Sequence, residues 1–339
     1  MSGEPILEVK GLQVEIPVDG AVLRPVRGVD LHVFRGETVA VVGESGCGKS
    51  LTALAIMGLL PRAARYTCDR ITLNGESLAN VSARRWRQLR GDRIAMIFQD
   101  PMTALDPCYR IGDQMREILQ QHRRISKQDA RERSLELLRK VGIPSPEERL
   151  SQFPHQLSGG LRQRVMIAMA LLCEPELIIA DEPTTALDVT IQSQILRLLQ
   201  DIQRDTGIGL ILITHDLGVV AGMADRIVVM YGGEVVEVGA CDDVLSRPLH
   251  PYTEGLMRSI PVPGQTKRGE LLGFIPGIVP RQTGERTRCG FIDRCPYAAE
   301  VCAAGPVPLS AGENGHEVRC AVPAQRRDPQ AWNRLTEAS

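Results

Sequence analysis

The sequence predicts an α/β fold in which helices cover both faces of a mainly parallel sheet. Up to about residue 240, apolar segments of strand length alternate with longer segments of helical periodicity, the order typical of parallel strands joined by helices. Charged helical sequence interrupts this alternation between residues 101 and about 174, and after residue 246 the composition shifts toward Pro, Gly and Cys. We therefore expect an α/β domain at 1–246, with a helical subdomain at about 101–174, and a loop-rich, cysteine-containing C-terminal extension at 247–339.

The expected elements follow in chain order. The first strand covers residues 37–43, which are apolar and rich in valine, and the first helix covers 49–60, where Pro61 would end it. Later apolar segments of strand length are 94–98, 177–180, 210–214 and 227–231. The clearest later helices are 161–172 and 190–206. Residues 261–288 are rich in Pro and Gly, which predicts an extended loop.

Composition excludes several functional classes. The 339 residues carry a formal charge of −1, so the chain lacks the basic character that nucleic-acid binding requires. No apolar run approaches the length of about 18 residues that a membrane span needs, and residues 1–10 lack the pattern of a secretory signal. Without an export signal, the nine cysteines indicate a reducing compartment and metal or redox chemistry rather than a disulfide scaffold.

A glycine-rich segment between the first strand and the first helix fits the phosphate-binding pattern G-x-x-x-x-G-K-[ST]. Its residues are Gly43, Glu44, Ser45, Gly46, Cys47, Gly48, Lys49 and Ser50, followed by Leu51. The glycines let backbone N–H groups turn inward around phosphate oxygens, and the helix adds its positive N-terminal end. Lys49 would reach the β- and γ-phosphates of ATP, and the Ser50 hydroxyl would bind Mg²⁺. Cys47 is expected to be a neutral filler.

The strand at 177–180 is followed by two acidic residues. Asp181 suits the coordination shell of Mg²⁺, and Glu182 is placed to polarise the attacking water. Such a pair can also serve only to cap a helix. The phosphate-binding loop in the same chain favours the catalytic interpretation.

A further motif precedes this acidic strand. Residues 157–164 read LSGGLRQR and would place Ser158, Gly159 and Gly160 at the N-terminus of a helix. In wording and order this segment resembles the signature of ABC ATPases. The resemblance covers about residues 5 to 240 and implies a P-loop NTPase fold of the ABC type, with a RecA-like core, an antiparallel β edge and a helical subdomain.

The same resemblance assigns the remaining site residues. Gln99 follows a strand as the Q-loop glutamine does, and would join Ser50 and Asp181 around Mg²⁺. His215 matches the switch histidine that contacts the γ-phosphate, and the segment 186–188, ending in Asp188, resembles the D-loop. The signature ends in Leu161 where glutamine is usual and methionine is common, so we expect activity to be retained. No aromatic residue stands at 14–17, where the family stacks one on adenine, so base stacking should be weak.

Further segments resemble the dipeptide and oligopeptide importers, so that the likeness extends over nearly the whole chain. They are 98–101, 153–157, 165–168, 181–190 and 248–253. The resemblance implies ATP-driven peptide import, while relatives that carry opines, glycosides, nickel chelates or antimicrobial peptides leave the cargo open. A non-transport ABC ATPase and an exporter are rival interpretations. The first typically carries two ATPase domains or long coiled coils, and the second often carries fused membrane segments; neither feature occurs in this sequence.

One phosphate-binding loop and one signature imply half of a dimer, because in this family the signature of one subunit closes over the ATP of another. In peptide importers the partner is commonly a second, different ATPase subunit. The resemblance also implies two integral membrane permease subunits and an extracytoplasmic solute-binding protein, with this chain peripheral at the cytoplasmic face of the inner membrane. We expect ATP to close the pair and hydrolysis to reopen it, which would move membrane helices through a groove near Gln99.

Four cysteines near the C-terminus have the spacing C-x5-C-x6-C-x17-C. They are Cys289, Cys295, Cys302 and Cys320. Structural zinc usually uses tighter pairs, and iron–sulfur ligands are spaced more variably, so the spacing alone leaves an iron–sulfur cluster, zinc or no metal open. The importer family carries a similar cysteine set that is associated with cluster binding, which favours a structural [4Fe–4S] cluster with zinc as the alternative.

Overall fold

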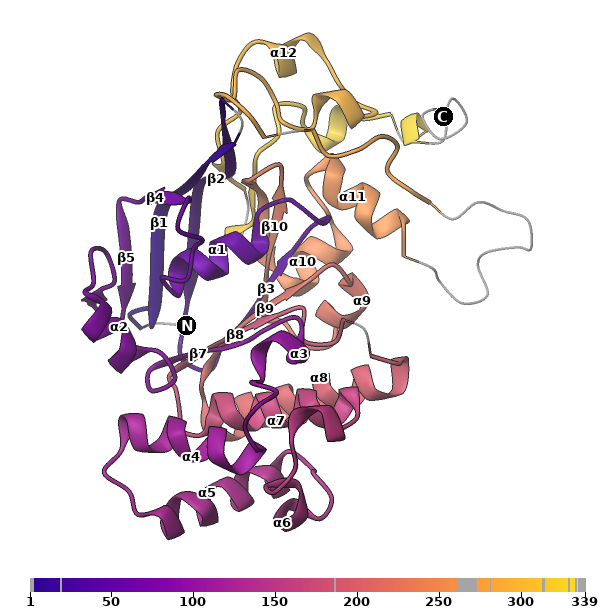
Figure 1. Cartoon of the computed structure of the whole chain (residues 1–339). Helices are drawn as coiled ribbons and strands as arrows, with labels where there is room; N and C mark the ends of the chain where they lie inside the picture. Colours follow the sequence, from indigo (N-terminus) through magenta and orange to yellow (C-terminus); the bar gives the residue numbers. More distant parts are fainter. Residues whose placement is uncertain are drawn as a thin grey trace. The chain divides into compact units, whose positions relative to one another are not determined.

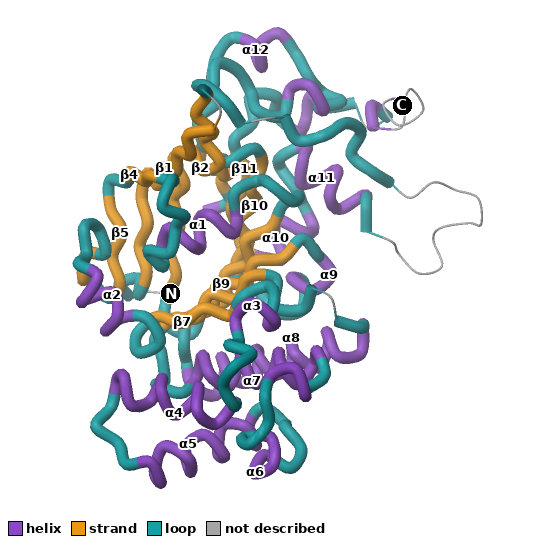
Figure 2. The backbone as a smooth tube through the Cα atoms, in the orientation of Figure 1, coloured by secondary structure: helices purple, strands orange, loops and turns teal. Residues whose placement is uncertain are grey.

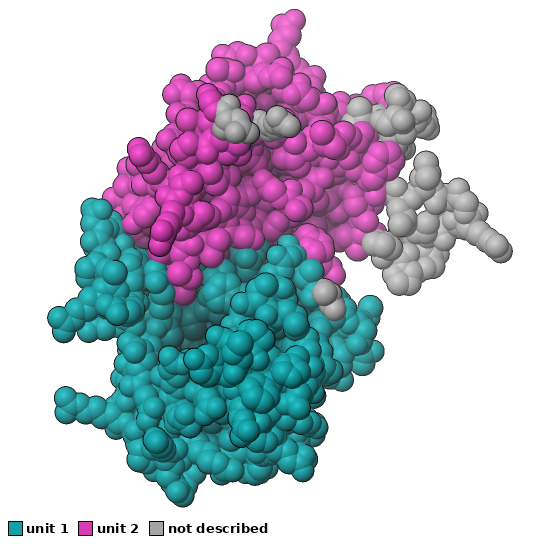
Figure 3. All heavy atoms as spheres, in the orientation of Figure 1, with its two compact units in different colours: residues 1–7, 32–38, 72–213 teal, residues 8–31, 39–71, 214–339 magenta. Residues whose placement is uncertain are grey.

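The computed structural model describes residues 3–18, 20–185, 187–260, 273–280, 282–312, 315–328, 330–332 and 334. The chain forms two compact units that are interleaved along the sequence (Figure 3). Unit 1 contains residues 1–7, 32–38 and 72–213, and unit 2 contains residues 8–31, 39–71 and 214–339. The functional division at residue 246 stays a prediction.

Unit 1 is built on three parallel strands in the order β9-β8-β7. They are β7 (Ile94–Ile97), β8 (Leu177–Asp181) and β9 (Gly209–Thr214). β8 pairs in parallel with both neighbours, and every residue of the three strands is buried. Continuous apolar sequence without alternation is what such a fully covered parallel strand requires, so the prediction from these segments is confirmed.

Helices make up most of the remainder of unit 1, and Figure 1 shows α4, α5, α6 and α7 grouped together. The helices are α2 (Ala83–Leu89), α3 (Pro101–Ala104), α4 (Ile111–His122), α5 (Lys127–Lys140), α6 (Pro146–Arg149), α7 (Gly159–Leu171) and α8 (Val189–Thr206). A 3-10 turn, Pro154–Gln156, precedes α7. Between residues 101 and 174 no strand occurs among the described residues, as the charged helical sequence predicted.

Unit 2 holds a mixed set of strands in the order β12-β13-β11-β10-β3. They are β3 (Thr38–Val42), β10 (Arg226–Tyr231), β11 (Glu234–Ala240), β12 (Ser310–Ala311) and β13 (Glu317–Val318). β10 is parallel to β3, whereas β11 runs antiparallel to both β10 and β13. The parallel arrangement predicted from the sequence therefore ends at β10, because the two-residue turn at Gly232 and Gly233 can join only antiparallel neighbours.

A second sheet, whose strands are orange in Figure 2, contains antiparallel pairs and confirms the β edge that the family resemblance implied. Its strands are β1 (Leu7–Val18), β2 (Ala21–Val33), β4 (Arg65–Thr67), β5 (Arg70–Leu73) and β6 (Glu76–Ser77). The order is β2-β1-β5-β6, and β4 also pairs with β1. Along β1 buried residues are interspersed with exposed ones, as expected for a strand with one covered face.

The C-terminal region packs on the core of unit 2. Its helices are α10 (Cys241–Ser246), α11 (Pro251–Arg258) and α12 (Glu300–Ala303), with 3-10 turns at Ile292–Arg294 and Ala324–Arg326. Tyr252, Phe291 and Trp332 are almost fully buried in one cluster with Tyr231 of β10. The extension thus shares the core of unit 2. No helix in the described part of the chain is long and apolar enough to cross a membrane.

The first helix of unit 2 is shorter than predicted. α1 (Lys49–Ile56) ends four residues before the expected position, whereas α9 (Leu217–Val220) lies farther along the chain, before β10. Gly58 has a φ of 62°, and the bonds Leu59 N–H to Leu54 O and Gly58 N–H to Ala55 O form a Schellman cap. The glycine therefore ends the helix before Pro61 can.

Candidate functional site

The glycine-rich loop at 43–50 links β3 to α1 within unit 2. Gly43 has a φ of 151° and Gly48 a φ of 102°. A Cβ on Gly43 would lie 2.2 Å from the carbonyl oxygen of Met230, and one on Gly48 would lie 2.1 Å from that of Pro25. Glycine is therefore required at both positions, because the loop is wedged between neighbouring backbone segments.

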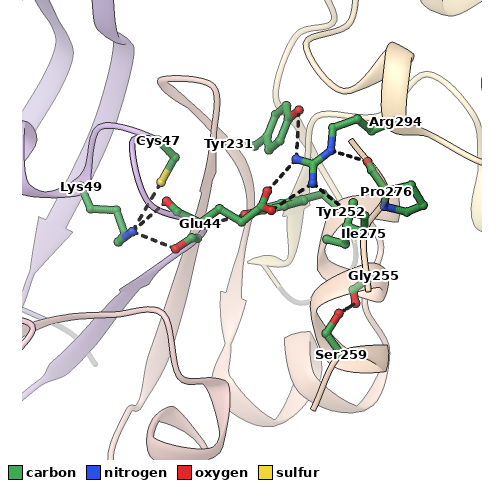
Figure 4. A network of polar contacts seen from close by, with 11 residues as sticks. Glu44, Cys47, Lys49, Tyr231, Tyr252, Gly255, Ser259, Ile275, Pro276 and Arg294 are labelled. Carbon is green, nitrogen blue, oxygen red and sulfur yellow. Dashed lines mark hydrogen bonds and ion pairs between the residues drawn. The ribbon is translucent and has the colours of Figure 1, made fainter. Parts of the chain in front are cut away.

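Lys49 lies inside this loop. The residue is 5% exposed, and its Nζ donates to the carbonyl oxygens of Gly43 (2.8 Å) and Glu44 (3.0 Å), as Figure 4 shows. The thiol of Cys47 lies 3.7 Å from the same Nζ, and burial raises the pKa of this thiol. Burial thus favours the neutral form of the Cys47 thiol, and its role as a filler stays a prediction. If a phosphate entered the loop, the Lys49 ammonium group could donate to its oxygens instead of to these two carbonyl oxygens.

Three side chains of the C-terminal region contact the loop, and the sequence analysis missed this role for all of them. The hydroxyl of Tyr252 accepts the N–H of Glu44 at 2.7 Å. Both terminal nitrogens of Arg294 donate to the Glu44 carboxylate, at 2.7 and 3.0 Å (Figure 4). Gln282 Nε2 donates to the carbonyl oxygen of Gly46 at 2.9 Å. The signals in the sequence were the motif at 248–253, which contains Tyr252, and the position of Arg294 directly before Cys295.

The carboxylate site lies in unit 1, at the end of β8. Asp181 is 6% exposed, and Glu182 follows it with a φ of 45° and an N–H donated to Ile213 O at 2.9 Å. Gln99 Nε2 and the Thr185 hydroxyl both donate to Glu182 Oε2, at 3.0 and 2.9 Å. The structure therefore brings Gln99 and Glu182 together as a site would require. The sequence analysis gave Thr185 no role, although it lies within the quoted segment 181–190.

The LSGG segment forms the start of α7. Ser158 is the N-cap residue, and its hydroxyl accepts the N–H of Leu161 at 3.4 Å. Ser158 and Gly159 are exposed, while a Cβ on Gly160 would come within 3.0 Å of Ile191. The N-terminal end of a 13-residue helix is thus presented on the surface of unit 1.

Two further expected residues are exposed. Asp188 caps α8 by accepting the N–H of Ile191 at 3.0 Å, while Ala186 of the same motif lies outside the described residues. His215 directly follows β9 and belongs to unit 2. Its neighbour Asp216 caps α9. The loop at 43–50 and His215 therefore belong to unit 2, and Gln99, Asp181, Glu182 and Ser158 to unit 1.

The four C-terminal cysteines share one neighbourhood. Cys302 is buried, the other three are half-buried, and the N–H of Cys289 donates to Cys302 O at 2.9 Å. Burial, together with the nearby Cys320, Cys289 and Cys302, raises the pKa of Cys295 to about 12. Among the described residues, no three His, Cys, Asp or Glu side chains are arranged to hold a metal ion. The iron–sulfur cluster and the zinc alternative therefore stay predictions.

Two family models match separate parts of the chain. Residues 26–185 match the model of the ABC transporter family, and residues 236–302 match the C-terminal region of oligopeptide/dipeptide transporters. The dipeptide transport ATP-binding protein DppD of Bacillus subtilis is 49% identical over 326 residues, which are 96% of this chain and 97% of that protein. The chain belongs to the ABC transporter family. DppD of Escherichia coli is 46% identical to this ABC protein over 94% of the chain and 97% of its own length.

Solved structures show the same fold. The post-hydrolysis dimer of the ATP-binding cassette MJ0796, bound to ADP and Pi, superimposes with a TM-score of 0.63 at 27% identity. The superposition covers 69% of this chain and 98% of the MJ0796 chain. The fold is that of an ABC ATPase cassette, and this ABC protein is an ATPase subunit of a transporter.

Proposed function

We propose that this ABC ATPase energises the import of di- or oligopeptides through separate membrane permease subunits. The observation that carries the proposal is the likeness to DppD over 96% of the chain, including the transporter-specific region at 236–302. Opines, glycosides and nickel chelates are alternative cargos for the same motor. The match at 236–302 disfavours a non-transport ABC ATPase.

The phosphates of ATP would bind to the loop at 43–50 and the first turn of α1. Its inward N–H groups and Lys49 would hold the β- and γ-phosphates, with Leu51 next to them in the helix. Mg²⁺ prefers oxygen ligands, and a hydroxyl, an amide and a carboxylate are ligands of this kind. Ser50, Gln99 and Asp181 would hold it, and it would neutralise charge that develops on the phosphates.

Glu182 would act as the base for the attacking water. Its carboxylate receives two hydrogen bonds on Oε2, which fix the plane of the group without burying it. Gln99 would contact both this carboxylate and the metal site, so that it can report whether the γ-phosphate is present. His215 would contact the γ-phosphate from the end of β9.

A second ATPase subunit would complete each site. The exposed start of α7, with Ser158, Gly159 and Gly160, would cover nucleotide held by the partner, and Asp188 would lie at the same interface. This chain carries one loop and one signature, which supports a pair, and the proposed partner is a related but different ATPase subunit.

The permease subunits would dock beside the Q-loop. Three large apolar side chains just after β7 are exposed: Phe98 (36%), Met102 (51%) and Tyr109 (58%). Exposed apolar groups gathered in one segment are typical of a protein contact. We place the chain at the cytoplasmic face of the inner membrane, with a solute-binding protein acting through the permease from the other side.

The four cysteines would hold a [4Fe–4S] cluster, with zinc as the alternative. Cysteine thiols are the donor type that such a cluster uses, and the four lie near one another, although no three of them are arranged to hold a metal ion in the described structure. The cluster would supply cross-links to a segment of the extension that is rich in loops. Cys302→Ser should remove the iron, acid-labile sulfide and visible absorption of anaerobically purified protein, whereas Cys108→Ser, at an exposed thiol, should not. A full iron content in the Cys302 variant, or zinc alone in the wild type, would contradict the assignment.

The transport proposal is tested on the assembled complex. ATPase turnover of the purified transporter should rise when binding protein and peptides are added, and Glu182→Gln should abolish it. Glu136→Gln, at an exposed glutamate on α5, is the matched control and should leave turnover unchanged. Stimulation by nickel chelates, opines or glycosides but not by peptides would reassign the cargo, and indifference to every solute would overturn the importer proposal.

A further inference from the structure

Arg294 is a buried arginine whose guanidinium group is fully engaged. Its side chain is 4% exposed, and it forms a two-pronged ion pair with the Glu44 carboxylate. Nε also donates to Pro276 O at 2.9 Å and Nη2 to Ile275 O at 3.1 Å, while Nη1 lies 3.4 Å from the Tyr231 hydroxyl (Figure 4). Planar, two-pronged pairs of this kind fix geometry as well as charge.

The partner of this arginine is the second residue of the phosphate-binding loop. Glu44 is 31% exposed on its side chain, so water could hydrate its carboxylate without help. Arg294, in contrast, is buried and needs a counter-charge. The ion pair therefore connects the segment around Arg294 in the extension to the loop. This connection is lost if either Arg294 or Glu44 is replaced.

Two further contacts hold the same half of the loop. The Tyr252 hydroxyl accepts the N–H of Glu44, and the Gln282 amide donates to Gly46 O. These backbone atoms lie on either side of Ser45, which is exposed, and a Cβ on Gly46 would meet nothing within 4 Å. Gly46 thus has open space on its outer side, and the extension supports the first half of the loop in addition to Lys49.

We propose that Arg294 is a positioning residue for nucleotide binding, which acts through Glu44 to hold the loop in the shape that receives phosphates. The C-terminal extension thereby sets the affinity for ATP. Arg294 touches no reacting atom in this arrangement. The proposal rests on the assignment of residues 43–50 as the phosphate loop, made above.

The test compares matched variants in the purified complex. Arg294→Gln and Glu44→Gln should each raise the KM and the directly measured Kd for MgATP about tenfold, or about 1.4 kcal/mol, and change kcat less than about twofold. The double variant should be no worse than the poorer single one, because both changes remove the same contact. Arg294→Lys should restore part of the affinity. Arg288→Gln, at an exposed arginine of the same segment that pairs with Asp293, should change nothing.

Two results would overturn the proposal. One is an unchanged Kd for MgATP in a folded Arg294→Gln protein. The other is a Kd of the double variant that rises by the product of the two single-variant increases. Should Arg294→Gln fail to fold, Glu44→Gln and Tyr252→Phe decide the matter, since the phenylalanine keeps the ring and loses only the acceptor of the Glu44 N–H. Lys49→Ala tests the assignment of residues 43–50 as the phosphate loop independently of Arg294. If that variant keeps full ATPase turnover, the loop assignment itself is wrong.

Discussion

At the scale of single residues, Glu182 shows how local strain and hydrogen bonding combine. Its φ of 45° is a left-handed conformation that costs a residue with a side chain about 1 kcal/mol or more. The cost is tolerated because the N–H is bonded to Ile213 O and the carboxylate receives Gln99 and Thr185. These hydrogen bonds hold the Glu182 carboxylate in one orientation, which the proposed role as catalytic base would require.

Thr185→Val should therefore lower kcat about tenfold and leave the KM for MgATP nearly unchanged. Valine has the shape of threonine but cannot donate to Glu182 Oε2, so the base loses one of its two orienting donors. Steady-state ATPase kinetics measure the split. Thr190→Val, at an exposed position of α8, is the control. An equal loss in both variants, or a rise confined to KM, would contradict an orienting role.

Residue-level motifs that are local in sequence could be predicted, and contacts between distant segments could not. Gly43 to Ser50 carry their chemistry in eight consecutive positions, and Asp181 and Glu182 directly follow an apolar strand. Arg294 and Glu44 are 250 residues apart, and nothing in the composition of either segment indicates that they meet. Thr185 was hidden for another reason, since a threonine near a carboxylate is too common to predict a role.

At the scale of elements, continuous apolar runs predicted the strands β7, β8, β9 and β10 to within one or two residues. A fully covered strand is almost entirely apolar, which makes its limits visible in the sequence. α1 was predicted too long because Gly58 was overlooked as a stop signal. The long antiparallel strands β1 and β2 were not located, because their mixed burial pattern leaves many polar residues inside them.

The start of α11 predicts a measurable pH dependence of stability. His250 is 2% exposed, and its Nδ1 accepts the N–H of Tyr252 at 3.0 Å. Burial lowers the pKa of this imidazole to about 3, with the charges of Arg327 and Arg319 acting in the same direction. The folded protein thus keeps His250 neutral, while the unfolded chain binds a proton below about pH 6.5. Its contribution is fully present above pH 6.5 and is lost as the pH falls toward 3.

His250→Asn should reduce this loss, because asparagine can cap the helix and does not titrate. Between pH 6.5 and 4.5, the free energy of unfolding of the wild type should fall more steeply than that of the variant, by up to about 1.4 kcal/mol per pH unit. Urea denaturation at several pH values measures both slopes. Glu237, whose carboxylate accepts the backbone N–H of His250, and His316 are present in both proteins. Parallel slopes would show that His250 is not the group responsible.

At the scale of the whole molecule, the expected ATP machinery is divided between two interleaved units. The phosphate loop belongs to unit 2 and the LSGG helix to unit 1. The signature is exposed at the start of α7, as the proposed contact with nucleotide on a partner subunit requires. If that proposal holds, binding of nucleotide by this chain and completion of the partner's site should be separable properties.

Ser158→Arg should separate them. The Kd of the isolated chain for MgATP should stay within about twofold of the wild type, whereas turnover of the assembled ATPase pair should fall more than about tenfold, because a bulky cation at the cap blocks the facing nucleotide. Equilibrium binding and coupled ATPase assays give the two values. Ser193→Arg, at an exposed serine on α8, should affect neither. A weaker Kd in the isolated Ser158 variant would place the signature at its own chain's nucleotide.

The 250-residue separation between Glu44 and Arg294 also has a consequence for the newborn protein. A ribosome that adds about 5–20 residues per second needs roughly 12 to 50 s to reach Arg294 after it has made Glu44. During this interval the emerging chain contains the complete sequence 43–50 but not yet Arg294, which pairs with Glu44. If Arg294 positions the loop as proposed, chains that end before Arg294 should bind MgATP more weakly than the full chain.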